Sequence, residues 1–507
     1  MDAKALRQKI LDLAIRGKLV PQDPNDEPAS VLLERIREQK KQMVKDGKLK
    51  PKDIKKDTVI FKGDDNLHYE KFPDGSVKCI EDEIPFNLPE GWEWARLKHI
   101  CMMVAGKPKP SEQIKHTPFE GSYPCFGGNG IRGYVDEYNR DGTFSIVGRQ
   151  GALCGNINVA SGKFYATEHA VITTIFTGID FDWCNYILEA LQLNKYATGA
   201  AQPGLSVANI LNVFVPVPPL NEQVIIGAKV SESIKLIDII EHEKASLQEI
   251  ANKIKSKILD LAIRGKLVPQ DPNDEPASVL LERIRAEKEE LIKQGKIKRN
   301  KKESVIFKGD DNSYYEKMPD GKLNCLNEQL MFELPEGWEW CNLLMIGTTN
   351  IGLTYRPADI DTQGIMVLRS CNIVNEKINL TDLARVKTSI RTNQFVQKND
   401  ILICARNGSR ALVGKCALIP ELDEQASFGA FMAIYRTPYF GYIIHFLRSN
   451  FFRSIFDDSN STTINQLTQD MLKRAIVPLP PLAEQHRIVK KLNTLLTDLS
   501  YIEKELN

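Results

Sequence analysis

One segment of the sequence occurs twice without a single change. Residues Ile10–Arg37 and Ile258–Arg285 both have the sequence ILDLAIRGKLVPQDPNDEPASVLLERIR. Internal repeats usually diverge, so an unchanged copy indicates either a recent duplication or two places in the fold that require the same surface. The sequence between and beyond the two copies decides which of these explanations holds.

The repetition continues in three shorter motifs outside the identical block. IFKGDDN begins at Ile60 and Ile306, LPEGWEW begins at Leu88 and Leu334, and a proline motif (VPVPPLNEQ or VPLPPLAEQ) begins at Val215 and Val477. The segments between LPEGWEW and the proline motif, residues 95–214 and 341–476, differ from each other. The chain thus alternates a repeated framework with two diverged segments, and we expect each diverged segment to form a domain of its own.

A long helix is predicted after the first proline motif. Apolar residues recur at steps of three, four and seven from Val230 to Leu261 without an intervening proline, and a similar stripe runs from Ile488 to Ile502. Such a stripe is typical of one apolar helix face. A narrow stripe on a long helix needs a partner helix, so we expect an antiparallel coiled-coil pair. The alternative is that the helix packs on its own globular domain.

Alignment of the two copies predicts a closed repeat. Position 507 of the second copy corresponds to position 245, and position 1 corresponds to position 249. The C-terminal and N-terminal helices together therefore reproduce the central helix, except for the equivalents of Ser246, Leu247 and Gln248. We expect a pseudo-two-fold circular repeat in which Met1 and Asn507 lie close together.

The predicted fold class is α+β, with two globular mixed α/β domains separated by a long antiparallel coiled-coil helical pair. The expected organisation is a first framework repeat at 1–94 (N-terminal helix, linker helix and hairpin), a first variable domain at 95–217, the central long helix with the second framework repeat at 218–340, a second variable domain at 341–479, and a C-terminal helix at 480–507. The two variable domains are interpreted as versions of one fold. Ile146–Gly151 aligns with Ile403–Gly408, because both continue from a strand into Arg, an amide and Gly, and this alignment pairs Arg149 with Arg406.

A search for catalytic motifs gives no candidate active site. Gly128, Gly130 and Gly133 have the spacing of a dinucleotide-binding loop, but turn residues follow them instead of a helix. No GxxxxGK[ST] phosphate-binding loop occurs, and for Glu168-His169 we expect a structural polar contact. The ten cysteines form no C-x-x-C pair and no cluster with zinc-ligand spacing.

Both variable domains instead carry Lys, Arg, Asn and Gln in glycine-rich turns. Such side chains contact phosphates and base edges in DNA complexes, where Arg favours guanine and Asn or Gln favours adenine. The net charge of +1 excludes nothing, since a binding surface needs only local charge. Each residue taken singly has an ordinary surface role as its alternative. The candidate DNA-binding residues are Lys107, Lys109, Asn129, Arg132, Arg149 and Gln150 in the first domain, and Arg356, Arg369, Asn372, Arg406, Asn407, Arg410 and Lys415 in the second.

The order of these motifs resembles the specificity subunit of a type I DNA restriction–modification system. The blocks DLAIRGKLVPQDPNDEPASVLLERIR, EIPFNLPEGWEW and LMFELPEGWEW are similar to the repeats of that family, and the resemblance covers essentially the whole chain. It implies a non-catalytic subunit with two target-recognition domains, each of which recognises one half of a split DNA site. It also implies helical spacers that fix the gap between the halves.

The resemblance further implies the partners of the chain. These are double-stranded DNA, two DNA methyltransferase subunits and, as an open point, restriction subunits. The chain itself is expected to bind no cofactor and no metal, with S-adenosylmethionine, ATP and Mg²⁺ bound by the partners.

The expected location is the cytoplasm, away from membranes, because the cysteines are scattered and no apolar span or signal peptide is present. Two alternatives to this function remain open: a non-catalytic bivalent adaptor with two protein-binding lobes, and a self-contained DNA methyltransferase, which lacks its motifs.

Overall fold

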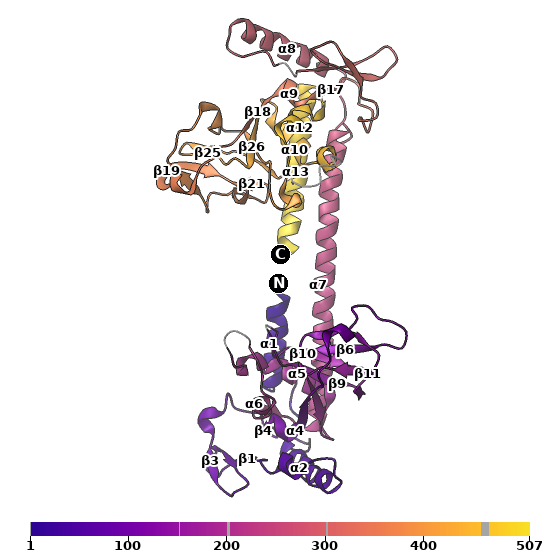
Figure 1. Cartoon of the computed structure of the whole chain (residues 1–507), viewed down its shortest axis with the longest axis vertical. Coiled ribbons are helices and arrows are strands. Elements are labelled where there is room, and N and C mark those ends of the chain that lie inside the picture. The colour runs from indigo at the N-terminus through magenta and orange to yellow at the C-terminus, as the bar shows by residue number, and fades with distance from the viewer. Residues whose placement is uncertain (1, 152, 200–202, 301–302, 458–465, 507) are drawn as a thin grey trace. The chain divides into compact units, whose positions relative to one another are not determined.

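The computed structural model describes residues 2–151, 153–199, 203–300, 303–457 and 466–506. The chain forms two compact units, Met1–Glu243 and Lys244–Asn507. Each unit combines helices with short, mostly antiparallel strands (Figure 1), so the predicted mixed composition of each half is confirmed. The predicted proximity of Met1 and Asn507 lies outside the described residues.

The framework repeat forms a helix followed by a three-stranded sheet in both units, whereas α3 has no counterpart in the described part of the second unit. The first copy contains α1 (Ala3–Ile15), α2 (Ala29–Lys45), α3 (Pro51–Ile54) and a sheet of β1 (Val59–Lys62), β2 (His68–Lys71) and β3 (Val77–Cys79). The second contains α8 (Ala277–Lys293) and a sheet of β14 (Val305–Lys308), β15 (Tyr314–Lys317) and β16 (Leu323–Cys325). Pro28 and Pro276 directly precede α2 and α8, where a missing N–H removes no helical hydrogen bond.

The predicted long helix is present as α7 (Leu220–Ile263), without interruption. In the first unit, Arg7 of α1 forms an ion pair with Glu241 of α7, at 2.6 Å between Nη2 and Oε2. In the second unit, Gln248 of α7 donates a hydrogen bond to Glu503 of α13 (Leu482–Leu506) at 3.4 Å. Within the predicted apolar stripe, Val230 and Ile237 are buried. The other stripe residues are half-buried toward the helix ends (Ile234, Ile258 and Leu261) and exposed between them (Ile240, Leu247, Ile250 and Ile254). The coiled coil stays a prediction.

The first variable domain contains two four-stranded sheets. One has the order β10 (Ile157–Ala160), β9 (Phe144–Gly148), β12 (Ala170–Ile175), β5 (Cys101–Ala105), and the other has the order β7 (Gly130–Val135), β6 (Tyr123–Gly127), β11 (Lys163–Ala166), β8 (Arg140–Asp141). Helices α4 (Leu97–Ile100), α5 (Phe181–Ala190) and α6 (Val207–Leu211) complete the domain. The hairpin of β6 and β7 contains the Gly128–Gly133 motif, so no helix follows these glycines and the dinucleotide interpretation is excluded.

The second variable domain repeats this topology. Its first sheet has the order β24 (Cys416–Leu418), β23 (Ile401–Cys404), β26 (Met432–Arg436), β18 (Thr348–Ile351), and its second has the order β22 (Ala384–Val386), β19 (Ile360–Leu368), β25 (Ala426–Phe428). It also contains α9 (Leu343–Ile346), the hairpin β20 (Ile373–Val374) and β21 (Lys377–Ile378), α10 (Phe440–Arg448), α11 (Asn450–Asp457) and α12 (Gln469–Arg474). The interpretation of the variable domains as two versions of one fold is thereby confirmed.

Each variable domain begins and ends in a two-stranded sheet. The strand β4 (Glu93–Arg96) of the LPEGWEW motif pairs with β13 (Phe214–Val217) of the proline motif, and β17 (Glu339–Asn342) pairs with β27 (Ile476–Leu479) in the same way. All four tryptophans of the motif are at most 5% exposed, so their rings pack inside the protein. None of the helices in the described part of the chain is long and apolar enough to cross a membrane.

Candidate nucleic-acid interface

Backbone hydrogen bonds establish which residues of the two variable domains are equivalent. The N–H of Gly148, at the end of β9, donates to the carbonyl of Asn156 at 2.8 Å, and the Gly148 carbonyl accepts from Gly155 at 2.8 Å. Cys404, at the end of β23, makes the same pair of bonds, to the carbonyl of Lys415 and from the N–H of Gly414. Gly148 and Cys404 therefore occupy the same position.

The next residue after each strand makes a second matching pair of bonds. Arg149 donates its N–H to the His169 carbonyl at 2.9 Å and accepts from Leu205 at 2.8 Å. Ala405 donates to the Phe431 carbonyl at 2.9 Å and accepts from the equivalent leucine, Leu467, at 2.7 Å. Arg149 is thus equivalent to Ala405.

The residue after that is Gln150 in the first domain and Arg406 in the second. Gln150 forms a β-bridge with Gly204, and Arg406 forms the corresponding bridge with Gln466. The predicted pairing of Arg149 with Arg406 is therefore wrong by one residue. It rested on similar letters, whereas the register is set by backbone bonds to distant segments, and a shift of one residue in extended chain reverses the direction of each side chain.

Several loops of the first domain meet where β9 ends. Gly128, after β6, lies against the backbone of Arg149 and Gln150. Asn129, in the same turn, accepts a hydrogen bond from the Asn156 amide at 3.1 Å. His169 joins them through its carbonyl. The structure therefore brings together three of the predicted residues: Asn129, Arg149 and Gln150.

The corresponding loops of the second domain also meet at one end of the sheet. The Asn407 amide lies 3.4 Å from the hydroxyl of Ser370, which follows β19. The guanidinium of Arg406 lies over the ring of Phe431, 5.4 Å from its centroid. Arg369 lies beside Gly429, in the loop before β26. Arg369, Arg406 and Asn407 are thus neighbours, although they follow different strands.

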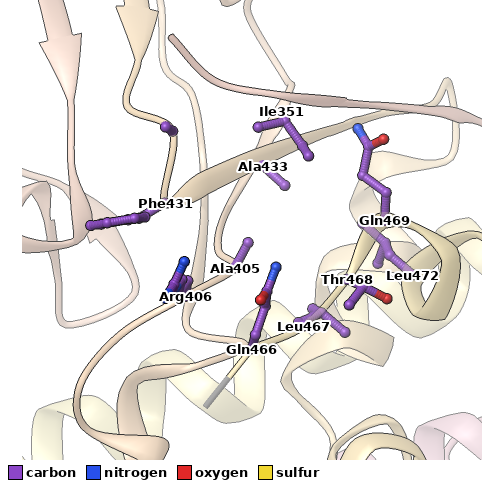
Figure 2. A pocket seen from close by; sticks show the side chains of 11 residues that line it. Ile351, Ala405, Arg406, Phe431, Ala433, Gln466, Leu467, Thr468, Gln469 and Leu472 are labelled. Carbon is purple, nitrogen blue, oxygen red and sulfur yellow. The ribbon is translucent and has the colours of Figure 1, made fainter. Parts of the chain in front are cut away.

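A pocket of about 210 Å³ opens beside Arg406 in the second domain (Figure 2). Its walls are mainly apolar, from Ala405, Ala433, Leu467 and Leu472, and Arg406 and Gln466 lie next to each other at the same site. The pocket has room because Ala405 has a small side chain. In the first domain this position holds Arg149, whose Nε donates to the Leu205 carbonyl at 3.2 Å.

Four of the predicted DNA-binding residues are engaged within the protein. Lys109 is only 8% exposed at its side chain and pairs with Glu137 at 2.8 Å, a contact that raises the pKa of Lys109. Arg356 pairs with Asp359 at 3.4 Å and Arg369 with Asp382 at 3.2 Å. Asn372 is 1% exposed, accepts from the Arg369 N–H and donates to the carbonyls of Asn379 and Asp382. For Lys109, Arg369 and Asn372, a DNA contact requires rearrangement of these pairings, whereas the Arg356 side chain is 83% exposed despite its ion pair.

Other predicted residues carry cationic groups that are not neutralised. Within the described residues, no carboxylate forms an ion pair with Lys107, Arg132, Arg149, Arg406 or Lys415. Arg132, in β7, donates to the Ser111 hydroxyl at 2.7 Å. Arg410, which begins the short 3-10 turn Arg410–Leu412, does not belong to this group. Cations without a carboxylate partner near the end of a sheet are suited to contacts with phosphates and bases.

The sequence-based prediction missed three residues of the site: His169, Phe431 and Gln466. The polar contact expected for Glu168-His169 is present, with His169 Nε2 at 3.3 Å from Glu168 Oε1. The sequence did not indicate that the His169 carbonyl bonds to Arg149 at the end of β9. Phe431 is 61% exposed, which is unusual for phenylalanine, but exposure is not visible in a sequence. His169 directly precedes β12 and Phe431 directly precedes β26. This correspondence is apparent only when the structures of the two domains are compared.

The described residues contain no group of three or more His, Cys, Asp or Glu side chains placed to hold a metal ion. Cys404, at the end of β23, is buried, and burial raises the pKa of its thiol. A thiol with a raised pKa is a poor nucleophile. The groups available at this site are therefore hydrogen-bond donors, cations and aromatic rings.

Comparison with known proteins identifies the family. The model of the type I restriction modification DNA specificity domain matches residues 89–249 and 355–507, one match in each half of the chain. The chain belongs to this family. The specificity subunit of the type I restriction enzyme EcoAI of Escherichia coli is 28% identical over 99% of this chain and 90% of its own length. The EcoEI specificity subunit of Escherichia coli is 30% identical over 67% of this chain and 61% of its own length.

Solved structures of the same class are also similar to the chain. The crystal structure of a type I restriction–modification S subunit from M. genitalium covers 83% of this chain and 94% of its own, with 16% identity and a TM-score of 0.35. Membership in the specificity-subunit family makes this chain a DNA-recognition subunit with two recognition domains, and not an enzyme in its own right.

Proposed function

We propose that this specificity subunit recognises a split DNA site, with one half contacted by each recognition domain. The observation that supports this best is the contrast between the two domains. They share sheet order and strand-end hydrogen bonds, but the side chains that these bonds position at the shared edge differ. One scaffold with two different sets of exposed polar groups is suited to two different base sequences.

We further propose that α7, paired with α1 and α13 as an antiparallel coiled coil, acts as the spacer between the half-sites. Its 44 residues correspond to roughly 66 Å of helix at about 1.5 Å per residue. Two readers that contact one side of a duplex would bind half-sites about one helical turn apart, roughly 34 Å. Several base pairs between the halves would then remain unrecognised.

The partners we propose are double-stranded DNA and DNA methyltransferase subunits, two per chain, since the framework surface occurs twice. Restriction subunits would join the same assembly. S-adenosylmethionine, ATP and Mg²⁺ would be bound by these partners, and the complex would work in the cytoplasm. Neither a two-lobed protein adaptor nor a self-contained methyltransferase fits membership in the specificity family as well.

The test is a map of methylated adenines in the genome of the source organism, with and without this gene. Loss of methylation at one class of split sites, restored by the intact gene, is the expected result. A second measurement is binding of duplex DNA by the purified complex of this chain with its methyltransferase subunits. No sequence-selective binding by that complex would favour the adaptor alternative, and binding of S-adenosylmethionine by the isolated chain would favour the self-contained enzyme.

A further inference from the structure

The corrected register changes which side chains are equivalent in the two recognition domains. Gln150 and Arg406 are both the second residue after the strand, and each forms an isolated β-bridge to the segment that precedes α6 or α12. Both residues are exposed, whereas their predecessors, Arg149 and Ala405, are half-buried. The backbone thus holds Gln150 and Arg406 outward in the same way.

Arg406 is held in place without being neutralised. Its guanidinium lies 5.4 Å from the centroid of the Phe431 ring, and its backbone N–H donates to the Phe431 carbonyl at 3.0 Å. No carboxylate of the described residues pairs with it, in contrast to Arg369 and Asp382. A cation over an aromatic ring keeps its hydrogen-bond donors available along the edge of the guanidinium plane.

Arg149 is held in a different way, although it is the arginine that the sequence suggests. It occupies the position of Ala405, and its Nε donates to the carbonyl of Leu205. Leu205 is equivalent to Leu467, and Leu467 lines the pocket of the second domain. The arginine in the first domain is therefore bound to the segment that corresponds to one wall of the pocket in the second.

From this geometry we infer that Gln150 and Arg406 are the specificity-determining residues of the first and second domains, and that Arg149 supports the structure of its domain. The inference rests on the proposed function and names the base that each residue contacts. Arg406 has the bidentate donor pair that fits O6 and N7 of guanine, and Gln150 has the donor and acceptor that fit N6 and N7 of adenine. Phe431 is a positioning residue for Arg406.

The test uses the complete complex of this chain with its methyltransferase subunits. The recognised site is first mapped with the unaltered protein, and binding is then measured in competition with duplexes that carry each of the four base pairs at every position of both half-sites. Arg406→Gln should change the preferred base at one position of the second half-site from guanine to adenine. Gln150→Arg should make the reverse change in the first half-site. Each preference should shift on the order of tenfold or more.

Two matched variants separate this inference from simpler explanations. Arg149→Ala introduces the residue that the second domain has at the same position, and it should leave the preferred base unchanged. Lys398→Gln removes a cation that pairs with Glu421, just before β23 and thus at the far end of that strand from Arg406; it should alter no base preference. Phe431→Leu should reduce the discrimination at the position recognised by Arg406 without changing the preferred base, and Phe431→Tyr should restore it.

Each outcome decides the inference. If Arg149→Ala changes the preferred base while Gln150→Arg does not, the sequence alignment identifies the reader and the inference is wrong. If Arg406→Gln lowers the affinity equally for all duplexes, Arg406 contacts phosphate and the inference is also wrong. A complex of the unaltered protein that shows no half-site preference would instead overturn the proposed function, and this is established before any variant is measured.

Discussion

The two recognition domains have the same backbone scaffold and differ in what that scaffold presents. In both, the residue after β9 or β23 donates its N–H to the carbonyl that precedes the neighbouring strand, β12 or β26, at 2.9 Å in each case. The side chains at the equivalent positions are Arg149 and Ala405, then Gln150 and Arg406. A fold held by backbone bonds can exchange its surface side chains with little loss of stability, so one architecture can serve two DNA sequences.

The framework shows the opposite behaviour, because identical sequence there makes identical contacts. Glu222 accepts a hydrogen bond from Trp92 Nε1 at 2.8 Å, and Glu484 accepts the same bond from Trp338 at 2.9 Å. Gln22 and its copy Gln270 each donate to these carboxylates at 3.2 Å. The contrast indicates that the framework is constrained by one repeated task, whereas the recognition domains are constrained only in their scaffold.

The largest expected effect comes from replacing residues 95–214 with the matching segment of another family member. Because each domain is closed by its own strand pair, β4–β13 or β17–β27, the exchange should leave the second domain intact. Methylation mapping should show a new first half-site and an unchanged second half-site. A change in both halves, or in neither, would contradict the assignment of one half-site to each domain.

An insertion of four residues near Ile240 of α7 tests whether the comparison extends to the spacing of the domains. The insertion adds about 6 Å of helix, or roughly two base pairs at about 3.4 Å each, and shifts the apolar stripe by nearly one complete turn. The unrecognised gap should lengthen while both half-sites keep their sequences. An active variant with the original gap would show that α7 does not set the spacing; thermal unfolding serves as the control for folding.

Acid sensitivity should distinguish the two units through different histidines. In the second unit, burial together with Arg448 lowers the pKa of His445 to about 4, and its Nδ1 has no partner among the described residues. The Glu376 carboxylate, which pairs with Arg448 and Lys255, also has a lowered pKa, so both groups act in the same direction. Since the unfolded histidine binds a proton near pH 6.5, stability is complete above that pH and is lost as the pH falls toward 4.

The loss attributable to His445 is on the order of 3 kcal/mol. His445→Phe should flatten the pH dependence between about 6.5 and 4, measured by hydrogen exchange of α10 in the full chain. In the first unit the histidine concerned is His99, which is half-buried and whose pKa is held well below its ordinary value by desolvation. His99→Met introduces the residue type that the second unit has at the equivalent position, Met345. It should flatten the pH dependence of stability in the first unit alone. If His445→Phe changed both units equally, the two would not titrate independently.

The smallest expected effect concerns Glu222 and Glu484, the two framework carboxylates that bind tryptophan. It should be nearly equal in the two units. Glu222→Ala and Glu484→Ala each leave a buried tryptophan N–H without its acceptor, which should lower the free energy of unfolding by about 1–2 kcal/mol. The two losses should agree closely, because the contacts are the same. As a control, Arg35→Ala breaks only an exposed pair with Glu27 and should change stability by less than about 1 kcal/mol. Clearly different losses for Glu222 and Glu484 would show that the framework copies are not equivalent.

Glu222 and Glu484 should also give the two units a different dependence of stability on pH. Burial raises the pKa of both carboxyl groups, and the cation of Arg487 opposes this rise only at Glu484. A raised pKa means that the folded state holds the proton more tightly than the unfolded state. The resulting stability is complete below the ordinary pKa of about 4.5 and is lost as the pH rises through the folded value. This pH dependence is opposite in sign to that of the histidines, and Glu222→Ala should remove it from the first unit.

The sequence by itself determined the repeated organisation of this protein. The duplicated blocks, the apolar stripe of α7 and the closing strand motifs are visible as regular patterns along the chain. Such patterns predict secondary structure well, because helix and strand periodicity depends on local geometry. The burial of the motif tryptophans and the absence of a dinucleotide-binding helix after Gly133 follow from the same local signals. The positions of the loops that carry Asn129, Arg149 and Gln150 were also predictable, since these loops follow strands.

The tertiary structure alone decided which of the candidate residues are available and which are equivalent. The polar type of Asn372 suggests exposure, but this side chain is buried and caps its own loop. Lys109 is neutralised by an ion pair with Glu137. The equivalence of Gln150 and Arg406 depends on hydrogen bonds to segments 20 to 60 residues away. Such pairings are fixed only when distant strands meet, and a one-residue difference in register, invisible in similar letters, changes which side chain faces a ligand.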